Sequence, residues 1–169
     1  MKNDPALLER RMRTREKAAE QSLIIKLSVV YFIVIYLLPG FDIRYGWSNT
    51  PLWMIIAAQV LALLGYLLVA RVFKENSYAS RIVEVEDEQK VIDKGPYAVV
   101  RHPMYSGVTL LYIMTPLALG SYWSMIPALL IIPLLVARIL SEEKILARDL
   151  DGYSDYQEKV KCRLIPFVW

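Results

Sequence analysis

The amino-acid sequence predicts an all-α integral membrane protein with about four transmembrane helices, the last two of which form a helical hairpin. Apolar residues make up 56% of the 169 residues, above the roughly 45–50% of soluble domains, and this share excludes intrinsic disorder. Counting His102 as neutral, charged side chains are absent from three long stretches, 27–41, 45–70 and 102–137. Such stretches are typical of helices that cross a lipid bilayer.

The first two stretches each predict one helix. The first helix is expected over about 22–38, with Lys26 near one end, where its long stem can reach the headgroups. Pro39 and Gly40 are expected to stop it. The second stretch fits a helix over about 51–72, because about 20 residues at about 1.5 Å each span a hydrocarbon core of about 30 Å.

The third stretch is too long for a single helix. Its 36 residues would extend for about 54 Å as one helix. The residues 120–124, Gly-Ser-Tyr-Trp-Ser, offer a break near the middle. We therefore expect two short helices, 104–119 and 122–140, folded into a hairpin, and whether both cross the bilayer completely stays open.

Basic residues indicate which loops face the cytoplasm. Six Lys and Arg residues lie in each of the segments 1–21, 71–101 and 138–163, whereas the loop between the first two helices holds one and the hairpin turn none. By the positive-inside rule, both termini and the loop 71–103 are cytoplasmic, in the inner (plasma) membrane if the source is bacterial. The aromatic residues of an interfacial belt gather at the opposite turns: Tyr45, Trp47, Trp53, Tyr122 and Trp123.

The chain divides into three parts: a cytoplasmic helix or tail over 1–21, two transmembrane helices over 22–73, and a core over 74–169. The first part is either an amphipathic helix on the anionic leaflet or a solvated tail, and it does not resemble a removable signal peptide. Cys162 is the single cysteine, so we expect a reduced thiol and no cysteine-based metal site. The net charge of +3 gives no argument for nucleic acid.

The cytoplasmic loop before the hairpin carries residues with specific chemistry. Alternating apolar and acidic residues over 82–86 favour a short extended stretch, and the Gly-Pro pair at 95–96 turns the chain. Pro103 fits the first turn of the next helix, which places His102 at the helix mouth. The unpaired N–H groups there, with Arg101, suit a carboxylate or phosphate. The alternative is that Arg101 and His102 only anchor and cap the helix.

A second group of polar residues follows the fourth predicted helix. Arg138 and Glu142 are one turn apart and share a helix face, so they form either a surface ion pair or a polar site at the membrane surface. Tyr153 and Tyr156 lie on one helical side, and their role is either packing or contact with a ligand.

Gly107 lies near the start of the third predicted helix. Without a side chain, it leaves room for another group to approach the backbone.

Four spaced motifs link these segments: Gly95-Pro96-Tyr97-x-x-x-Arg101-His102-Pro103-x-Tyr105-x-Gly107, Arg138-x-x-x-Glu142-Glu143, Tyr153-x-x-Tyr156 and Arg163-x-x-Pro166. In this order and in this position relative to the helices, they resemble the isoprenylcysteine carboxyl methyltransferase family of integral membrane enzymes. The resemblance covers about residues 77–169. The wider superfamily includes phospholipid N-methyltransferases and sterol reductases.

The resemblance implies an S-adenosylmethionine-dependent methyltransferase of the EC 2.1.1 class, with S-adenosylhomocysteine as product. Its cytoplasmic cofactor pocket would be built from the loop after the second helix and the C-terminal segment; in agreement, no G-x-G-x-x-G motif opens a helix. Arg138, which would face the acceptor's carboxylate, and Glu142 are the implied catalytic residues. The implied cofactor-binding residues are Gln89, Lys90, Val91, Ile92, Tyr97, His102, Pro103, Met104, Tyr105 and Glu142.

The acceptor is less defined, because the N-terminal half matches no isoprenoid-binding region. Methyl transfer is an in-line displacement that needs alignment and exclusion of water, and it requires no metal. A carboxylate acceptor needs only an orienting cation such as Arg138, whereas an amine or thiol needs a base such as Glu142 or Glu143. We expect a lipophilic or lipidated acceptor that enters from the membrane lipids.

Three alternatives stay open for the function. A phospholipid or other amine or thiol methyltransferase would share the cofactor site. A membrane reductase that uses NADPH is the second, although this chain looks short for one, and a non-enzymatic membrane scaffold is the third. The sequence also leaves the oligomeric state open.

Overall fold

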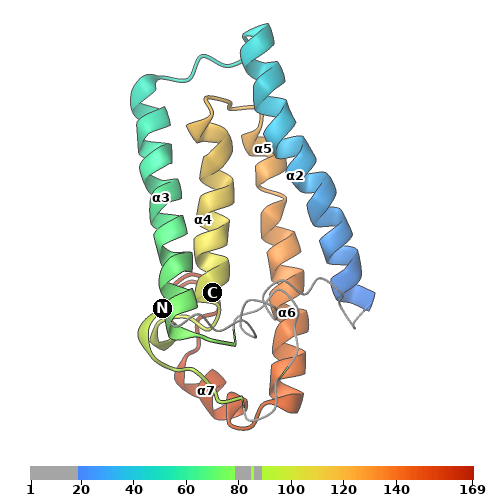
Figure 1. Cartoon of the computed structure of the whole chain (residues 1–169), viewed down its shortest axis with the longest axis vertical. Coiled ribbons are helices and arrows are strands. Elements are labelled where there is room, and N and C mark those ends of the chain that lie inside the picture. The colour runs from blue at the N-terminus through green and yellow to red at the C-terminus, as the bar shows by residue number, and fades with distance from the viewer. Residues whose placement is uncertain (1–18, 79–84, 86–88) are drawn as a thin grey trace.

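The protein, described here by a computed structural model, is a bundle of long helices with a smaller helical end (Figure 1). The structure describes residues 19–78, 85 and 89–169. Most of the segment 1–21 and of the expected extended stretch 82–86 lies outside the described residues. The elements are α2 (Ala19–Tyr45), α3 (Leu52–Glu75), the 3-10 helix η1 (Gly95–Ala98), α4 (Pro103–Ala118), α5 (Met125–Ala128), α6 (Ile131–Asp149) and α7 (Tyr153–Lys159).

The described part of the chain contains no strand, which confirms the all-α prediction for these residues. α2, α3, α4 and the α5–α6 pair run along one another, and α7 closes one end (Figure 1). We call this end, where α3 stops and α4 begins, the lower end. The opposite end, with the α2–α3 loop and the α4–α5 turn, is the upper end.

α2 is longer than the sequence predicted. The expectation that Pro39 and Gly40 end the first helix at residue 38 is wrong, because the helix continues to Tyr45 with Pro39 inside it. A proline removes one helical hydrogen bond, which packing partners can compensate in a membrane helix. Here Tyr31, Ile35 and Pro39 are buried on one face of α2 and hold the helix against the bundle on both sides of the proline.

α3 and α4 are in close backbone contact. A Cβ atom on Gly65 would lie 2.7 Å from the carbonyl oxygen of Gly107, and a Cβ on Gly107 would lie 2.7 Å from that of Gly65. Small residues at facing positions are a common way for membrane helices to approach each other. The space at Gly107 therefore admits a neighbouring helix and no ligand.

The hairpin prediction was correct in outline and wrong in its last helix. α4 ends at Ala118, close to the expected residue 119. The expected helix 122–140 is instead divided into α5 and α6 around residues 129–130, and α6 continues to Asp149. Pro133 lacks the N–H group of a regular helix, and the Tyr31 hydroxyl donates to the Ala128 carbonyl at 3.2 Å beside the break.

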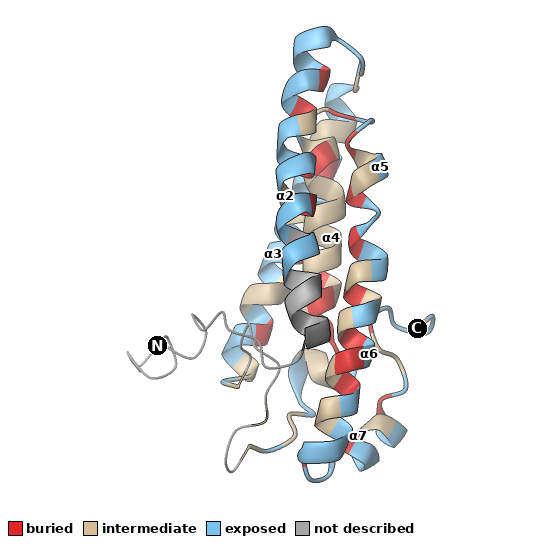
Figure 2. Ribbon diagram, turned by 90° about the vertical axis from the view of Figure 1, so that its right-hand side faces the viewer, coloured by how far each residue is buried: buried red, intermediate tan, exposed pale blue. Residues whose placement is uncertain are grey.

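Two of the described helical segments, Leu52–Glu75 and Met125–Asp149, are long and apolar enough to cross a membrane. The outward faces of the bundle are exposed over most of their length (Figure 2), and on α3 they carry apolar side chains such as Leu52 and Trp53, at 70% and 68% exposure. Apolar surfaces of this extent need a partner other than water. Lipid is that partner in a membrane protein.

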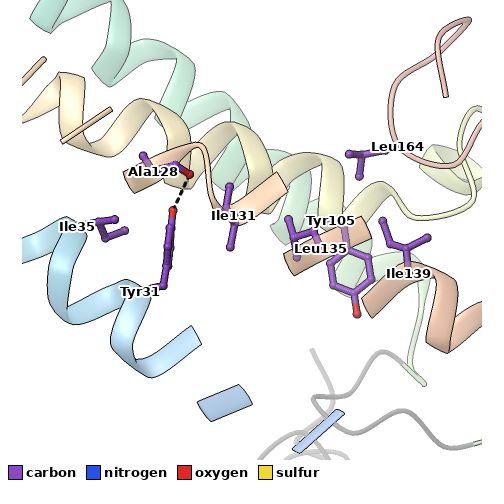
Figure 3. Packing of buried hydrophobic residues seen from close by; sticks show 8 residues of the cluster. All are labelled: Tyr31, Ile35, Tyr105, Ala128, Ile131, Leu135, Ile139 and Leu164. Atoms are coloured by element: carbon purple, nitrogen blue, oxygen red, sulfur yellow. Dashed lines mark hydrogen bonds between the residues drawn. The ribbon is translucent and has the colours of Figure 1, made fainter. Parts of the chain in front are cut away.

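The main apolar core lies between α2, α4 and the α5–α6 pair (Figure 3). Tyr105 and Ile139 form its lower part, and Leu164, from the segment after α7, packs beside them (Figure 3). A second cluster at the lower end contains Tyr153 and Tyr156 of α7. The first turn of α4 and the middle of α6 are thus fixed between two cores.

Candidate functional site

A pocket lies at the lower end, where α3, the segment 89–92, η1, α4, α6 and α7 converge. Nine of the eleven residues that the sequence implied for the site line it: Gln89, Lys90, Val91, Ile92, Tyr97, His102, Met104, Tyr105 and Glu142. Residues that were not assigned to the site complete the wall: Asn76, Tyr78, Arg101, Leu146, Leu150, Tyr153 and Tyr156. Three of the four spaced motifs therefore meet around one cavity.

Two of the implied residues lie outside the pocket wall. Pro103 is fully buried as the first residue of α4 and fixes the direction in which His102 and Met104 leave the backbone. Arg138 lies on α6, one turn before Glu142, and is connected to the pocket through Tyr105.

Glu143 is the centre of a buried ion-pair network. Its Oε1 accepts from Arg101 Nε at 2.8 Å and its Oε2 from Arg163 Nε at 2.9 Å. His102 Nε2 lies 3.3 Å from the same Oε1. The side chains of Arg101 and Glu143 are only 6% and 7% exposed. Buried charges of this kind are stable only when paired and hydrogen-bonded, so the cluster is a structural clamp.

This clamp bears on two of the alternatives that the sequence left open. Arg101 also donates from Nη1 to the Val160 carbonyl at 2.8 Å, and the His102 N–H donates to the Arg163 carbonyl at 2.9 Å. The Arg101 guanidinium and the His102 N–H are thus occupied by the chain itself, which favours the alternative that Arg101 anchors the start of α4. Glu143, considered as a base for an amine or thiol, is also excluded, because both of its oxygens are bound by guanidinium groups.

Glu142 differs from Glu143 because it faces the pocket. The Tyr105 hydroxyl donates to Glu142 Oε2 at 2.7 Å and accepts from Arg138 Nε at 2.9 Å. The Glu142 side chain is 22% exposed, and His102 Nδ1 lies 3.8 Å from its other oxygen. Tyr105 therefore joins an arginine on the bundle side to a carboxylate on the pocket side.

Tyr97 and Asn76 form a second wall of the pocket. The Asn76 side-chain amide donates to the Tyr97 hydroxyl at 2.8 Å, and the Tyr156 hydroxyl donates to the Tyr97 carbonyl at 2.7 Å. Burial raises the pKa of Tyr97 to about 12. The ring thus presents a neutral hydroxyl to the pocket at physiological pH.

Tyr153 carries a polar atom that the chain leaves without a partner. The residue is 4% exposed and lines the pocket, and among the described residues its hydroxyl is the buried side-chain atom that has no hydrogen bond. Burial raises the pKa of Tyr153, so the hydroxyl is neutral. A buried unpaired hydroxyl costs about 1–3 kcal/mol, so Tyr153 is a candidate hydrogen-bond donor to a molecule bound in the pocket.

The segment 89–92 contributes main chain as well as side chains. The peptide groups of Lys90, Val91 and Ile92 form no backbone hydrogen bond with another described residue. Peptide groups that line a pocket can bind a planar polar ligand as a strand partner would. The sequence analysis did not assign Asn76 or Tyr153 to the site. The one sequence signal for Tyr153 was the Tyr-x-x-Tyr spacing, and Asn76 had none.

Comparison with known proteins connects this site to a family. Residues 53–151 match the profile of the family described as phospholipid methyltransferase. The chain is 27% identical over 150 residues to protein-S-isoprenylcysteine O-methyltransferase B of Arabidopsis thaliana, covering 87% of this chain and 74% of that protein. It is 29% identical over 123 residues to a probable protein-S-isoprenylcysteine O-methyltransferase of Oryza sativa subsp. indica, covering 72% of this chain and 62% of that protein.

A solved structure shares the fold. The eukaryotic intramembrane Ras methyltransferase, isoprenylcysteine carboxyl methyltransferase, superposes with a TM-score of 0.62 over 90% of this chain at 24% sequence identity. The match covers 54% of that longer protein. The resemblance seen in the spaced motifs is therefore confirmed, and the helical bundle is the architecture of a membrane methyltransferase.

Proposed function

The chain belongs to the phospholipid methyltransferase family, and from this premise we propose that it transfers a methyl group from S-adenosylmethionine to the carboxylate of a lipophilic, isoprenylcysteine-like acceptor. One observation carries the proposal: the Arg138–Tyr105–Glu142 chain connects the bundle to the polar pocket. An acceptor held on the bundle side and a cofactor held in the pocket would meet at this chain.

The pocket residues fit the cofactor. S-adenosylmethionine supplies a methyl group on a positively charged sulfur. The carboxylate of Glu142 suits the amine or the ribose hydroxyls, and the orphaned Tyr153 hydroxyl gains a partner from any of the cofactor's polar atoms. The aromatic ring of Tyr97 and the peptide groups of the segment 89–92 suit the planar base.

The roles of the two implied catalytic residues follow from their environments. A carboxylate acceptor is already a nucleophile at neutral pH, so the protein chiefly aligns it and excludes water. Arg138, whose guanidinium is oriented by Tyr105, matches a carboxylate in charge and in bidentate geometry. Glu142 holds the cofactor next to it.

A membrane placement with four spans completes the proposal. In it, both termini and the pocket lie on the cytoplasmic side, and a lipophilic acceptor enters between the helices from the inner leaflet. The three segments with six basic residues each all belong to this side. α2, with 27 residues, extends for about 40 Å and is long enough to cross.

A phospholipid amine is the second candidate acceptor, because the matching family profile carries that description. A protonated amine must lose a proton before it attacks, and Glu142 is the carboxylate that faces the pocket. A non-enzymatic scaffold, the third possibility, would bind no S-adenosylmethionine.

Two measurements on the detergent-purified chain test the proposal. Calorimetry with S-adenosylhomocysteine should show saturable binding, and its absence would overturn the enzymatic assignment. With labelled S-adenosylmethionine, a prenylcysteine analogue should be methylated and phosphatidylethanolamine should not. The reverse pattern would identify a phospholipid amine as the methyl acceptor.

Variants separate the acceptor side from the cofactor side. Arg138→Ala should reduce turnover by about 100-fold or more, as expected when an orienting charge is lost, while binding of S-adenosylhomocysteine is retained. Glu142→Ala should reduce both turnover and cofactor binding. Arg148→Ala, on an exposed position of α6, is the matched control. Unchanged turnover in both site variants would contradict the assignment.

A further inference from the structure

The segment after α7 exposes a run of apolar side chains. Phe167 is 99% exposed, Val168 75% and Ile165 50%, and Pro166 between them is exposed as well. Single exposed apolar residues are common on proteins, but a contiguous group at one tip marks an interaction surface.

The tip belongs to a closed loop. The N–H groups of Leu164 and Ile165 donate to the Trp169 oxygen at 2.7 and 3.0 Å, and the Phe167 N–H donates to Cys162 Sγ at 3.2 Å. Phe167 has a φ of 64°, in the left-handed region that bulky residues avoid. The hydrogen bonds of the loop hold this backbone conformation and leave the Phe167 side chain projecting from the tip.

The base of the loop lies where the apolar bundle meets the polar lower end. Leu164 packs in the main core with Ile139, while the preceding residue, Arg163, reaches the buried carboxylate of Glu143. Ser106 Oγ, in the first turn of α4, donates to the Leu164 carbonyl at 2.5 Å. In Figure 2 the C-terminal end of the chain reaches sideways from the bundle, nearer to its middle than α7. The loop therefore emerges at the height of a membrane boundary.

Basic side chains lie beside the apolar tip. Lys159 and Lys161 are exposed on the stretch that leads to the loop, and Arg163 is partly exposed. Glu158 is the acidic neighbour in this stretch, so positive charge predominates. An apolar tip flanked by cations is the composition that binds the interface of an anionic lipid leaflet.

We propose that residues 164–169 form an interfacial loop that places Phe167 and Val168 in the headgroup and upper acyl region of an anionic leaflet, with Lys159 and Lys161 at the headgroups. This docking fixes the height of α4 and of the pocket, because the base of the loop is bonded to both. The inference rests on the membrane placement in the proposed function and is independent of the methyl acceptor, so a wrong acceptor leaves it intact.

Spin-label depth measurements on the full chain in nanodiscs test the proposal. A nitroxide on Val168→Cys, in a Cys162→Ser background, is compared with labels on Asp155→Cys of α7 and on Leu63→Cys of the exposed α3 face. The ratio of oxygen to nickel-chelate accessibility should be several-fold higher at position 168 than at 155, and should approach that at 63. A ratio equal to that at 155, or protection from both reagents as in a protein contact, would overturn the proposal.

Phe167→Gly provides the matched variant. Glycine adopts a φ of 64° without strain, so the loop should fold as well as before while the label at position 168 shifts toward the value at 155. If the label keeps its depth, the phenylalanine does not anchor the loop and the proposal fails.

Lipid composition tests the basic residues. In nanodiscs that contain phosphatidylglycerol, the label at position 168 should lie deeper than in phosphatidylcholine alone, and Lys161→Glu should reduce this difference. Equal depth in both lipids would contradict the assignment of Lys159 and Lys161 to anionic headgroups.

Discussion

The two ends of the bundle each bury a carboxylate, and they differ in what the chain leaves unsatisfied nearby. At the upper end, Asp42 is 1% exposed. It accepts from the Ser48 N–H at 2.7 Å and the Ser48 hydroxyl at 2.6 Å, and also from the Ser121 hydroxyl. This cluster ties the end of α2 to the turn between α4 and α5 and is complete within the protein.

The lower end combines a complete cluster with an incomplete one. Glu143 is bound on both oxygens by Arg101 and Arg163. Next to it, Glu142 is partly exposed in the pocket and Tyr153 keeps an unpaired hydroxyl. The comparison teaches that a buried charge by itself does not mark a functional site, whereas polar groups left without partners do.

Removal of the Glu143 carboxylate should have the largest effect. Glu143→Ala leaves the buried guanidinium of Arg101 without its ion partner, which should lower the free energy of unfolding by about 3–5 kcal/mol. Unfolding titrations in detergent measure this loss. Asp149→Ala, whose partner Arg148 is on the surface, should stay close to wild type. Equal stability of the two variants would contradict the role of Glu143 as a clamp.

The cluster at the upper end should affect stability and leave the pocket unchanged. Asp42→Ala removes hydrogen bonds to a charged acceptor, each worth about 1.5–3 kcal/mol, so the free energy of unfolding should fall by at least one such step. The Kd for S-adenosylhomocysteine, measured by calorimetry at a temperature where the variant is folded, should match wild type. A raised Kd would show that the two ends are coupled.

Alkaline pH should weaken the lower end. The pKa of Tyr97 is raised by burial to about 12, compared with about 10 in an unfolded chain. The fold favours the neutral phenol, so this contribution to stability is complete below pH 10 and is lost as the pH rises from 10 to 12. Tyr97→Phe should show a weaker loss of stability over this interval in unfolding titrations. If the wild type and Tyr97→Phe lose stability to the same extent over this interval, the Tyr97 hydroxyl is not buried.

Tyr153→Phe should have the smallest effect on the fold and a specific effect on the ligand. The variant removes an unpaired hydroxyl, so the free energy of unfolding should be unchanged or slightly higher. It also removes one hydrogen bond to the ligand, worth about 1 kcal/mol, so the Kd for S-adenosylhomocysteine should rise about fivefold. Tyr156→Phe is the control, because that hydroxyl bonds the Tyr97 carbonyl and its loss should lower stability. An unchanged Kd in Tyr153→Phe would show that the Tyr153 hydroxyl does not bind the ligand.

The sequence predicted the helices wherever periodicity and charge were decisive. The helix expected over 51–72 matches α3, and Pro103 lies in the first turn of α4 as expected. The predictions failed near two other prolines. Pro39 lies within a continuous helix, whereas a break separates α5 from α6 ahead of Pro133. Whether a proline stops a helix depends on the neighbours that compensate the lost hydrogen bond, and these come from distant parts of the chain.

The spaced motifs predicted many of the residues that line the pocket, but they did not predict which of two adjacent carboxylates faces it. Glu142 and Glu143 are adjacent in sequence and about 100° apart around the helix, so one faces the pocket and the other faces Arg101. No local pattern indicates which is which, because the answer depends on where α4 and the segment after α7 are placed.

By itself, the sequence determined a helical membrane protein, the family and most of the residues around the pocket, since these follow from the apolar stretches and from spaced motifs. The tertiary structure alone decided that Arg101 and Glu143 form a buried ion pair, that Gly107 admits α3, and that the Tyr153 hydroxyl has no hydrogen-bond partner among the described residues. The physical reason is that hydrogen-bond satisfaction is a property of groups brought together by folding, and no single segment contains it.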